Sequence, residues 1–450
     1  MEILLNIENN HNERLLTKAV QNVIDKMNVG DILVFPAGEY VLSTVYLKSG
    51  ISLKFLKGCK ILGSENFDDY DRDEKVGYPL YQDASHSFFH CSMFVGVNVE
   101  NIAIEGEGII DMRSVWDENN VRNMAHRGAK CIALKNCKNV KLSGFTVENC
   151  TDLAVYFAGC ENVEVYGLNV KTYIDGISPD NCKNVTIKNC NVESGDDGIV
   201  FKTSYTLNRL ETCERITVEN CEIRSRCNAI KFGTETNGGF TDITVENVKI
   251  SDTRLAGIAV ESVDGATVKN LKFKNISMTN VCTPFFIHLG DRMRGPKDLK
   301  IGKISNVWFE NITATGEYRE YEIMPWNYDS YMADDRVQYP WAIGKAENFS
   351  GVNDKKDAWQ ITSNCCGLRG FDLEDITFKN VNLELWGSAK TINRNVTEKA
   401  QDYPEIYVYG TNLPAKGMYF RHINGLTLEN FEVKTINPDI RENFVFDDVK

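Results

Sequence analysis

Apolar and polar residues alternate along most of the chain in short segments that follow one repeated pattern. The pattern is apolar-x-apolar-x-x-apolar-x-apolar, often preceded by Asn, as in NVTIKNCNV (184–192), DITVENVKI (242–250) and NVWFENITA (306–314). Alternation with a period of two predicts β-strands, and the two-residue step in the middle predicts a bend. Each copy is therefore expected to form a pair of short strands separated by a corner.

Copies of this pattern recur at a roughly regular distance. In the central part of the chain they begin at residues 139, 162, 184, 215, 242, 270 and 306, which are 22 to 36 residues apart. A unit of this size cannot bury its apolar side alone, so neighbouring units must stack. Because β-branched residues dominate and the unit length varies, leucine-rich repeats are disfavoured. The pattern predicts an all-β fold, a single-stranded right-handed parallel β-helix of about ten coils.

The whole chain, 1–450, is predicted to form one β-helix domain. Apolar residues at helical spacing in 13–27 predict a helix, so residues 1–30 are expected to form a helical cap over the N-terminal end. An aromatic-rich stretch between two sets of coils lacks the repeated pattern and predicts a loop excursion. The main coils, the aromatic excursion and the C-terminal coils are expected at 31–314, 315–370 and 371–450.

Aligning consecutive copies places acidic side chains in register. Ile177 and Ile199 fall on one inward ladder, so Asp175 and Asp197, each two residues earlier, are expected to point outward from adjacent coils. Strands in a sheet lie roughly 4.8 Å apart, which makes these two aspartates close neighbours. Asp196 directly precedes Asp197 and can turn toward the same place. Three carboxylates are therefore expected to converge on one face.

Three converging carboxylates favour acid–base chemistry over a purely structural role. A single Asp in a turn commonly bonds backbone amides, but like charges this close cannot all ionise cheaply. The pKa of one carboxyl is expected to rise, and such a group beside an ionised partner provides a general acid and a general base. Asp175, Asp196 and Asp197 are therefore the predicted catalytic residues. Gly195 and Gly198 flank the pair and are expected to leave room for a substrate close to the backbone.

Further polar residues are expected on the same outward face, although each taken alone could also be a solvated surface residue. The predicted binding residues are Tyr156, Lys202, Asn228, Lys231, Glu235, Glu261, His288 and Arg292. The six histidines are scattered, and Cys365-Cys366 has no partner pair, so neither a metal nor another cofactor is predicted.

Composition narrows the partners and the compartment. The formal net charge is −13, which disfavours nucleic acid and anionic membranes as partners. The N-terminal residues lack the features of a signal peptide, and 14 cysteines in such a chain predict reduced thiols in the cytoplasm. Cys137, Cys160, Cys182 and Cys213 take equivalent places before successive copies, where stacked interior side chains are expected. The oligomeric state is not predicted.

The motif around the aspartates resembles that of a known family. YIDGISPDNCKNVTIKNCNVESGDDGIVFKT (173–203) is similar to the central motif of the polygalacturonase-like family, glycoside hydrolase family 28. NIAIEGEGIIDMRSVW (101–116) resembles an early coil of that family, and YPEIYVYGTNLPAKGMYFRHINGL (403–426) a C-terminal segment of its bacterial exo-type relatives. The chain looks like a divergent bacterial exo-type member.

The resemblance implies an inverting glycosidase in which Asp196 protonates the glycosidic oxygen while Asp175 and Asp197 activate water. Two family motifs are changed, since Gly-His-Gly is here Cys227-Asn228-Ala229 and Arg-Ile-Lys is here 259–261, Ala-Val-Glu. The histidine and both basic residues are thus absent. The resemblance therefore indicates the chemistry more firmly than the sugar, which can be uronic or neutral.

The leading hypothesis is an inverting, exo-acting hydrolase of pectin-type or related plant or microbial oligosaccharides. Two other classes stay open: a polysaccharide lyase or epimerase on the same scaffold, and a catalytically silent carbohydrate-binding β-helix. The absent basic pair disfavours a lyase, and the three aspartates in register disfavour a silent protein.

Overall fold

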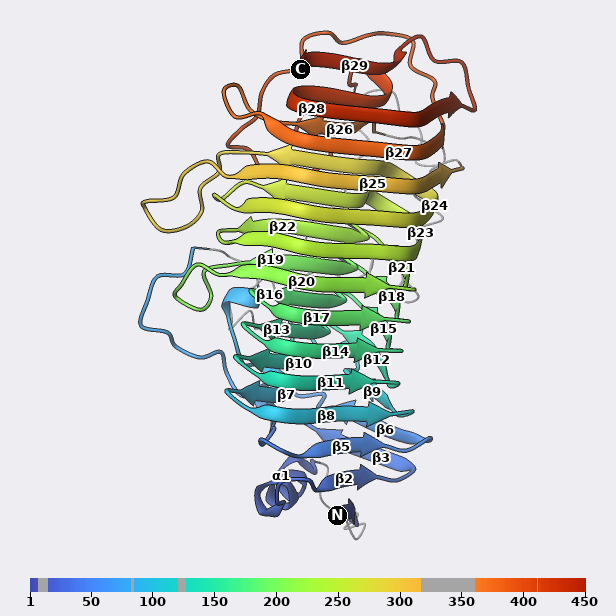
Figure 1. The fold of residues 1–450 in the computed structure, drawn as a ribbon. Helices are drawn as coiled ribbons and strands as arrows, with labels where there is room; N and C mark the ends of the chain where they lie inside the picture. The colour runs from blue at the N-terminus through green and yellow to red at the C-terminus, as the bar shows by residue number, and fades with distance from the viewer. Residues whose placement is uncertain (7–14, 82–84, 120–126, 317–360, 411) are drawn as a thin grey trace.

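The computed structural model describes residues 1–6, 15–81, 85–119, 127–316, 361–410 and 412–450. The fold is the predicted parallel β-helix, in which strands stack in parallel from one end of the molecule to the other (Figure 1). The predicted aromatic excursion lies mostly outside the described residues, since 317–360 are not among them.

Each central coil contributes one strand to each of three parallel stacks. The stack that carries the site contains β7 (Ser92–Val97), β10 (Lys130–Lys135), β13 (Val155–Ala158), β16 (Ile177–Asp180), β19 (Ile199–Thr203) and β22 (Ile230–Thr236). The second contains β8 (Glu100–Gly106), β11 (Lys138–Ser143), β14 (Glu161–Tyr166), β17 (Lys183–Lys188) and β20 (Thr212–Glu219). The third contains β9 (Ile109–Asp111), β12 (Thr146–Cys150), β15 (Asn169–Thr172), β18 (Asn191–Ser194) and β21 (Glu222–Ser225).

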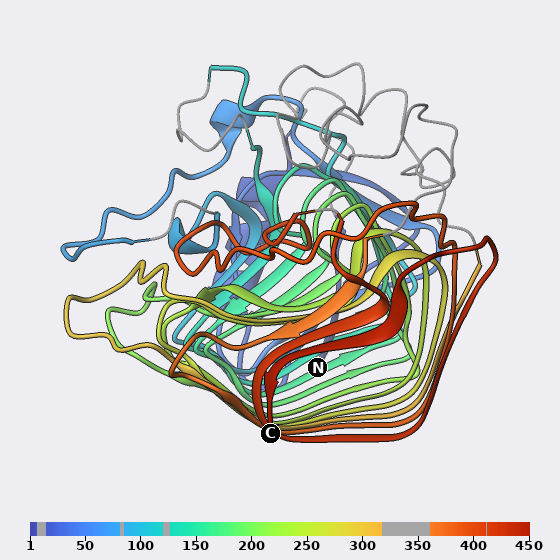
Figure 2. The same ribbon diagram turned by 90° about the horizontal axis from the view of Figure 1, so that it is seen from above.

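Later coils run through their corners as longer, bent strands. These are β23 (Gly239–Ser262), β24 (Thr267–Leu289), β25 (Lys303–Thr315), β27 (Leu373–Leu385) and β28 (Ala415–Thr435), whereas β26 (Ser363–Cys366) and β29 (Glu442–Val449) are short strands. Seen along the axis, the coils superpose along one edge, while loops project from the opposite side (Figure 2). The loops can therefore vary in length without disturbing the stacked edge.

The first coils differ from the prediction in detail. The helix α1 covers Thr17–Lys26, a shorter stretch than 13–27, and buries Val20 and Ile24 against the core. Residues 1–30 are not all helical, because β1 (Glu2–Leu4) pairs in parallel with β2 (Ile32–Phe35). The remaining early elements are β3 (Gly38–Leu42), β4 (Val45–Tyr46), β5 (Ser52–Phe55) and β6 (Cys59–Gly63), with short 3₁₀ turns at Phe67–Asp69 and Ser85–Ser87.

Asparagine marks the corners because it tolerates the left-handed backbone conformation. Asn139, Asn162 and Asn184 have φ of 55°, 58° and 55°, and each begins a copy of the repeated pattern. Their side chains form a ladder, in which the Asn162 amide donates to Asn139 over 2.9 Å and the Asn184 amide donates to Asn162 over 3.0 Å. The same residue type therefore both makes the turn and links adjacent coils.

The interior is apolar along its whole length. The stacked cysteines are buried as predicted, and the backbone N–H of Cys137 and of Cys160 each point at the next sulfur, 3.3 and 3.4 Å away. Farther along, Phe273, Phe309 and Phe378 stack with ring centroids 4.9 and 4.6 Å apart. All 14 cysteines are free and buried.

Among the described residues, no helix has the length and hydrophobicity needed to cross a membrane.

Candidate active site

The three predicted catalytic aspartates lie together at the entry to adjacent strands. Ile177 pairs with Ile199 in the β16–β19 register, which places Asp175 and Asp197 at equivalent points of neighbouring coils. The backbone N–H of Asp197 lies 3.3 Å from Oδ1 of Asp175. Both of these aspartates are buried, with 4% exposure, whereas the Asp196 side chain is 17% exposed. Asp196 is thus the most accessible of the three.

The flanking glycines serve a different purpose from the one expected. A Cβ atom on Gly195 would lie 2.2 Å from the carbonyl oxygen of Tyr173, and one on Gly198 would lie 2.6 Å from that of Ala229. The space beside each glycine is therefore filled by the backbone of a neighbouring coil, not kept open for a substrate. These glycines let the coils stack closely at the corner that carries the aspartates.

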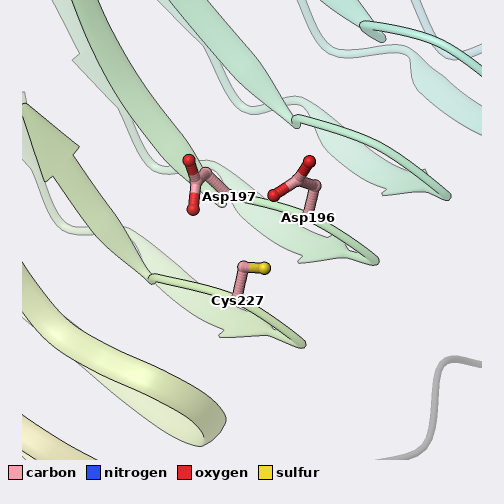
Figure 3. Close-up of side chains that lie close together, drawn as sticks. All are labelled: Asp196, Asp197 and Cys227. Carbon is pink, nitrogen blue, oxygen red and sulfur yellow. The ribbon is translucent and has the colours of Figure 1, made fainter. Parts of the chain in front are cut away.

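A thiol completes the immediate surroundings of the aspartate pair. Oxygen atoms of Asp196 and Asp197 and the sulfur of Cys227 lie within 4.8 Å of one another (Figure 3). Two carboxylates and a thiolate are possible metal ligands, but burial raises the pKa of the Cys227 thiol well above its usual value. The Cys227 thiol therefore keeps its proton at neutral pH.

Asn228 holds the buried aspartate in place. Its backbone N–H and its side-chain amide both donate to Oδ1 of Asp197, over 3.1 and 2.9 Å. Its own side-chain oxygen accepts a hydrogen bond from the N–H of Ala256 at 3.0 Å. Asn228 is completely buried and is fixed between two coils. The family motif that the sequence resembles has histidine at this position.

Each buried aspartate faces a buried lysine. Nζ of Lys202 lies 3.6 Å from Asp175 and 3.1 Å from Glu235. Nζ of Lys231 lies 3.6 Å from Asp197, 3.8 Å from Glu261 and 2.8 Å from Glu405. Ammonium groups at this distance favour the ionised form of a carboxyl.

The effect of burial on the pKa values of Asp175 and Asp197 is nevertheless larger than the effect of these lysines. Burial raises the pKa of Asp175 to about 6, with Lys202 opposing the rise and Asp196 adding to it. Burial raises the pKa of Asp197 to about 8, where Lys231 opposes the rise and the charges of Asp196 and Asp175 add to it. The pair of Asp175 and Asp197 therefore retains a proton near neutral pH.

The other predicted binding residues lie around this centre, and the structure buries most of them. Tyr156 donates to the carbonyl oxygen of His86 over 2.8 Å and lies 3.3 Å from Asp180, so its hydroxyl is engaged within the protein. Nδ1 of His288 is 2.8 Å from the Tyr409 hydroxyl, and burial lowers the pKa of this histidine to about 3. His288 is therefore neutral.

Arg292 reaches the site edge but is bound by other groups. Its Nε donates to Asp264 over 3.0 Å, and its Nη2 donates to the carbonyl oxygen of Thr234 over 2.7 Å. Asp264 also pairs with Nη2, so its carboxylate neutralises the guanidinium. The sequence prediction placed Arg292 at the groove edge without identifying Asp264 as its counter-ion.

Three residues near the centre escaped the sequence prediction because they lie on loops outside the repeat. Glu405 contacts Lys231 although 174 residues separate them. Nη2 of Arg127 lies 3.7 Å from Oδ2 of Asp196, and Nε2 of His86 lies 3.7 Å from Glu235. No periodic signal places these side chains, although the 403–426 segment that contains Glu405 carries part of the family resemblance.

Comparison with known proteins places this parallel β-helix in a family. Residues 26–324 match the model of glycosyl hydrolases family 28, so the chain belongs to that family. It is 24% identical over 320 residues to an exo-poly-α-D-galacturonosidase of Dickeya chrysanthemi, and the match covers 59% of this chain and 53% of that protein. It is 22% identical over 295 residues to a probable polygalacturonase of Vitis vinifera, with 61% and 60% covered. The chain thus spans a little over half the length of these relatives.

The fold comparison agrees with the family assignment. A family 28 exopolygalacturonase of Yersinia enterocolitica superposes with a TM-score of 0.63 at 19% identity, covering 98% of this chain and 76% of that one. At this level of identity the likeness establishes the fold, which is the predicted one.

Proposed function

We propose that this protein is a glycoside hydrolase that cleaves O-glycosyl bonds in pectin-type or related oligosaccharides, with inversion and from a chain end. The observation that carries the proposal is the placing of Asp196, which is partly exposed, beside two buried carboxyls on adjacent coils. Membership of glycosyl hydrolases family 28 and the names of the matched relatives support this class of substrate.

In the proposed reaction, Asp196 gives its proton to the glycosidic oxygen as the bond to the anomeric carbon breaks. Water attacks that carbon from the opposite face and loses a proton to Asp175, so Asp196 gives one proton and Asp175 takes one. Near neutral pH the raised pKa of Asp197 keeps a proton on the carboxyl beside Asp196, from which the Asp196 carboxylate can be protonated again. Lys202, whose Nζ lies 3.6 Å from Asp175, favours the ionised form of that base.

Stereochemistry is the sharpest part of the proposal. An inverting pair of carboxyls is typically separated by roughly 6.5–9.5 Å and a retaining pair by roughly 5–5.5 Å. The nearest oxygens of Asp196 and Asp197 are within 4.8 Å, so inversion assigns the water to the side of Asp175. The exo mode is proposed from the name of the matched exo-poly-α-D-galacturonosidase, and Glu405 brings a loop residue into contact with Lys231.

The experiment incubates the wild-type protein and Asp196→Asn with neutral and uronic oligosaccharides and follows the first product by NMR. Inversion predicts that the newly released anomer is opposite to the one in the substrate, and single-unit products indicate exo action. Asp242→Asn is a matched control, because Asp242 is an exposed ladder residue that accepts from Asn270 at 2.7 Å. Turnover by Asp196→Asn at the wild-type rate would exclude Asp196 as the acid, and an unsaturated product would indicate a lyase.

We also propose that the protein works in the cytoplasm. Fourteen buried cysteines without a disulfide are typical of a reducing compartment. Fractionation of the native source and detection of the protein with an antibody would test this, and recovery from the extracellular fraction would contradict it.

A further inference from the structure

One ammonium group at the site is shared by three acidic side chains. Nζ of Lys231 lies 2.8 Å from Glu405, 3.6 Å from Asp197 and 3.8 Å from Glu261. All four side chains are at least nine-tenths buried. We call Lys231, Glu261, Glu405 and the adjacent His288 the Lys231 cluster. Glu261 and His288 are direct neighbours in the β23–β24 register, so the cluster spans three coils and one loop.

Several polar atoms of the Lys231 cluster lack a hydrogen bond. Within the part of the chain that the structure describes, both carboxylate oxygens of Glu261, Oε2 of Glu405 and Nε2 of His288 are buried with no hydrogen-bond partner. Buried polar atoms are nearly always hydrogen-bonded, and leaving one unpaired is costly. A group of such atoms beside an aspartate of the proposed catalytic trio indicates a place for a polar ligand.

We propose that the Lys231 cluster is the subsite for an uncharged sugar unit, whose hydroxyl groups satisfy these atoms. This inference rests on the proposed glycosidase function and adds the chemical class of one sugar unit to it. Sugar hydroxyls would donate to Glu261 and Glu405 and accept from Lys231. In the tautomer in which Tyr409 donates to Nδ1 of His288, Nε2 carries a hydrogen and is a further donor.

A uronate carboxylate does not fit this subsite. It would become a fourth acidic group around one lysine, and bringing like charges together disfavours binding. Lys231 is already paired with Glu405 at 2.8 Å, so it offers a substrate carboxylate no uncompensated positive charge. Arg292 does not change this balance, since Asp264 neutralises it and leaves Nη1 as a donor suited to a hydroxyl.

Sequence and structure agree on this point. The motif Arg-Ile-Lys of the family that the sequence resembles is Ala259-Val260-Glu261 here, so both of its basic residues are absent. A cation of the motif is therefore replaced by a buried acid within 3.8 Å of the remaining lysine. Because the atoms of the cluster are covered, sugar binding also requires the covering chain to shift.

The test compares native oligogalacturonides with the same oligosaccharides after carboxyl reduction, together with nitrophenyl glycosides of neutral sugars and their matched uronides. We expect the wild type to favour the neutral member of its best pair by about tenfold or more in kcat/KM. Glu261→Gln should narrow that preference severalfold, and Glu405→Gln, which changes the loop residue of the cluster, should do the same. If one of these variants does not fold, the other still tests the proposal. Glu222→Gln, which breaks an exposed pair with Lys249, is the control and should leave the ratio unchanged.

The outcomes separate the two proposals. Turnover that favours uronides would overturn the uncharged subsite while leaving the glycosidase function intact. If no glycoside is hydrolysed, the proposed function fails, and calorimetric binding of the neutral and uronic products then decides the subsite by itself. Tighter binding of the neutral product that weakens in Glu261→Gln supports the subsite, and equal or tighter binding of the uronate overturns it.

Discussion

The backbone N–H and the side-chain amide of Asn228 both donate to the same oxygen of Asp197, over 3.1 and 2.9 Å. The second oxygen of Asp197 faces Nζ of Lys231 at 3.6 Å. One buried carboxyl is therefore held by an amide on one side and an ammonium group on the other. This arrangement fixes the orientation of Asp197 without the histidine that the family motif has at position 228.

Replacing Asn228 by Ala should loosen this aspartate and weaken the fold. The variant removes the side-chain donor to Asp197 and the acceptor of the Ala256 N–H, so we expect a loss of about 1–3 kcal/mol in the free energy of unfolding. A fall in kcat should accompany it, because Asp197 would no longer be held. Urea unfolding and steady-state kinetics measure the two effects. Asn191→Ala, which removes an exposed amide hydrogen bond to Asn169, should change neither by much.

Lys231 should contribute strongly to stability because three acidic groups depend on it. Removing one member of a buried ion pair typically costs about 3–5 kcal/mol, so Lys231→Met should lower the free energy of unfolding by about that amount. Adding Glu405→Gln should recover part of the loss, since it removes one of the stranded charges. A double-mutant cycle by urea unfolding measures the coupling. Strictly additive effects would show that the 2.8 Å contact carries no coupling energy.

The role of Asp196 as proton donor predicts a dependence on the leaving group. A good leaving group needs little protonation, so Asp196→Asn should lose about 10²–10⁴-fold in kcat with an alkyl or sugar leaving group and much less with a dinitrophenolate. A Brønsted series of aryl glycosides measures the difference. An equal loss across the whole series would assign Asp196 a role other than protonating the departing oxygen.

The repeat made the backbone and the central carboxylates predictable from the sequence. Period-two alternation fixes which residues point inward, and constant stacking then fixes which outward residues are neighbours, so Asp175 and Asp197 could be placed one above the other. The same reasoning placed Asn228 and Lys231 on the next coil, beside Val200 and Asp197. Local spacing is sufficient here because each coil contacts mainly the coils before and after it.

The surroundings of those residues were not predictable in the same way. Glu405, Arg127 and His86 reach the site from loops, whose course depends on long-range packing rather than on a period. Burial of the outward-facing side chains also depends on those loops, so residues expected on the open outward face, such as Glu261 and His288, are covered. The start of the chain was also not predictable from the repeat. β1 pairs with β2 in parallel, but neither strand belongs to a copy of the repeated pattern.

The buried aspartates predict how stability changes with pH. Burial raises the pKa of Asp175 to about 6 and that of Asp197 to about 8, whereas both have a pKa of about 4 in the unfolded chain. Between these values the folded protein binds more protons than the unfolded chain, so the free energy of unfolding falls as pH rises. The stabilisation from these two groups is fully present below about pH 4 and is lost as pH rises through the folded-state pKa values.

Asp197→Asn isolates one part of this dependence because asparagine does not titrate. We expect the free energy of unfolding of the wild type, relative to the variant, to decrease between about pH 5 and pH 9, with a slope of at most about 1.4 kcal/mol per pH unit for one proton. Urea unfolding at a series of pH values measures this difference, and Asp242→Asn serves as the exposed control. A difference that stays constant over this range, or that increases with pH, would mean that Asp197 is ionised in the folded protein and that Lys231 and Asn228 outweigh its burial.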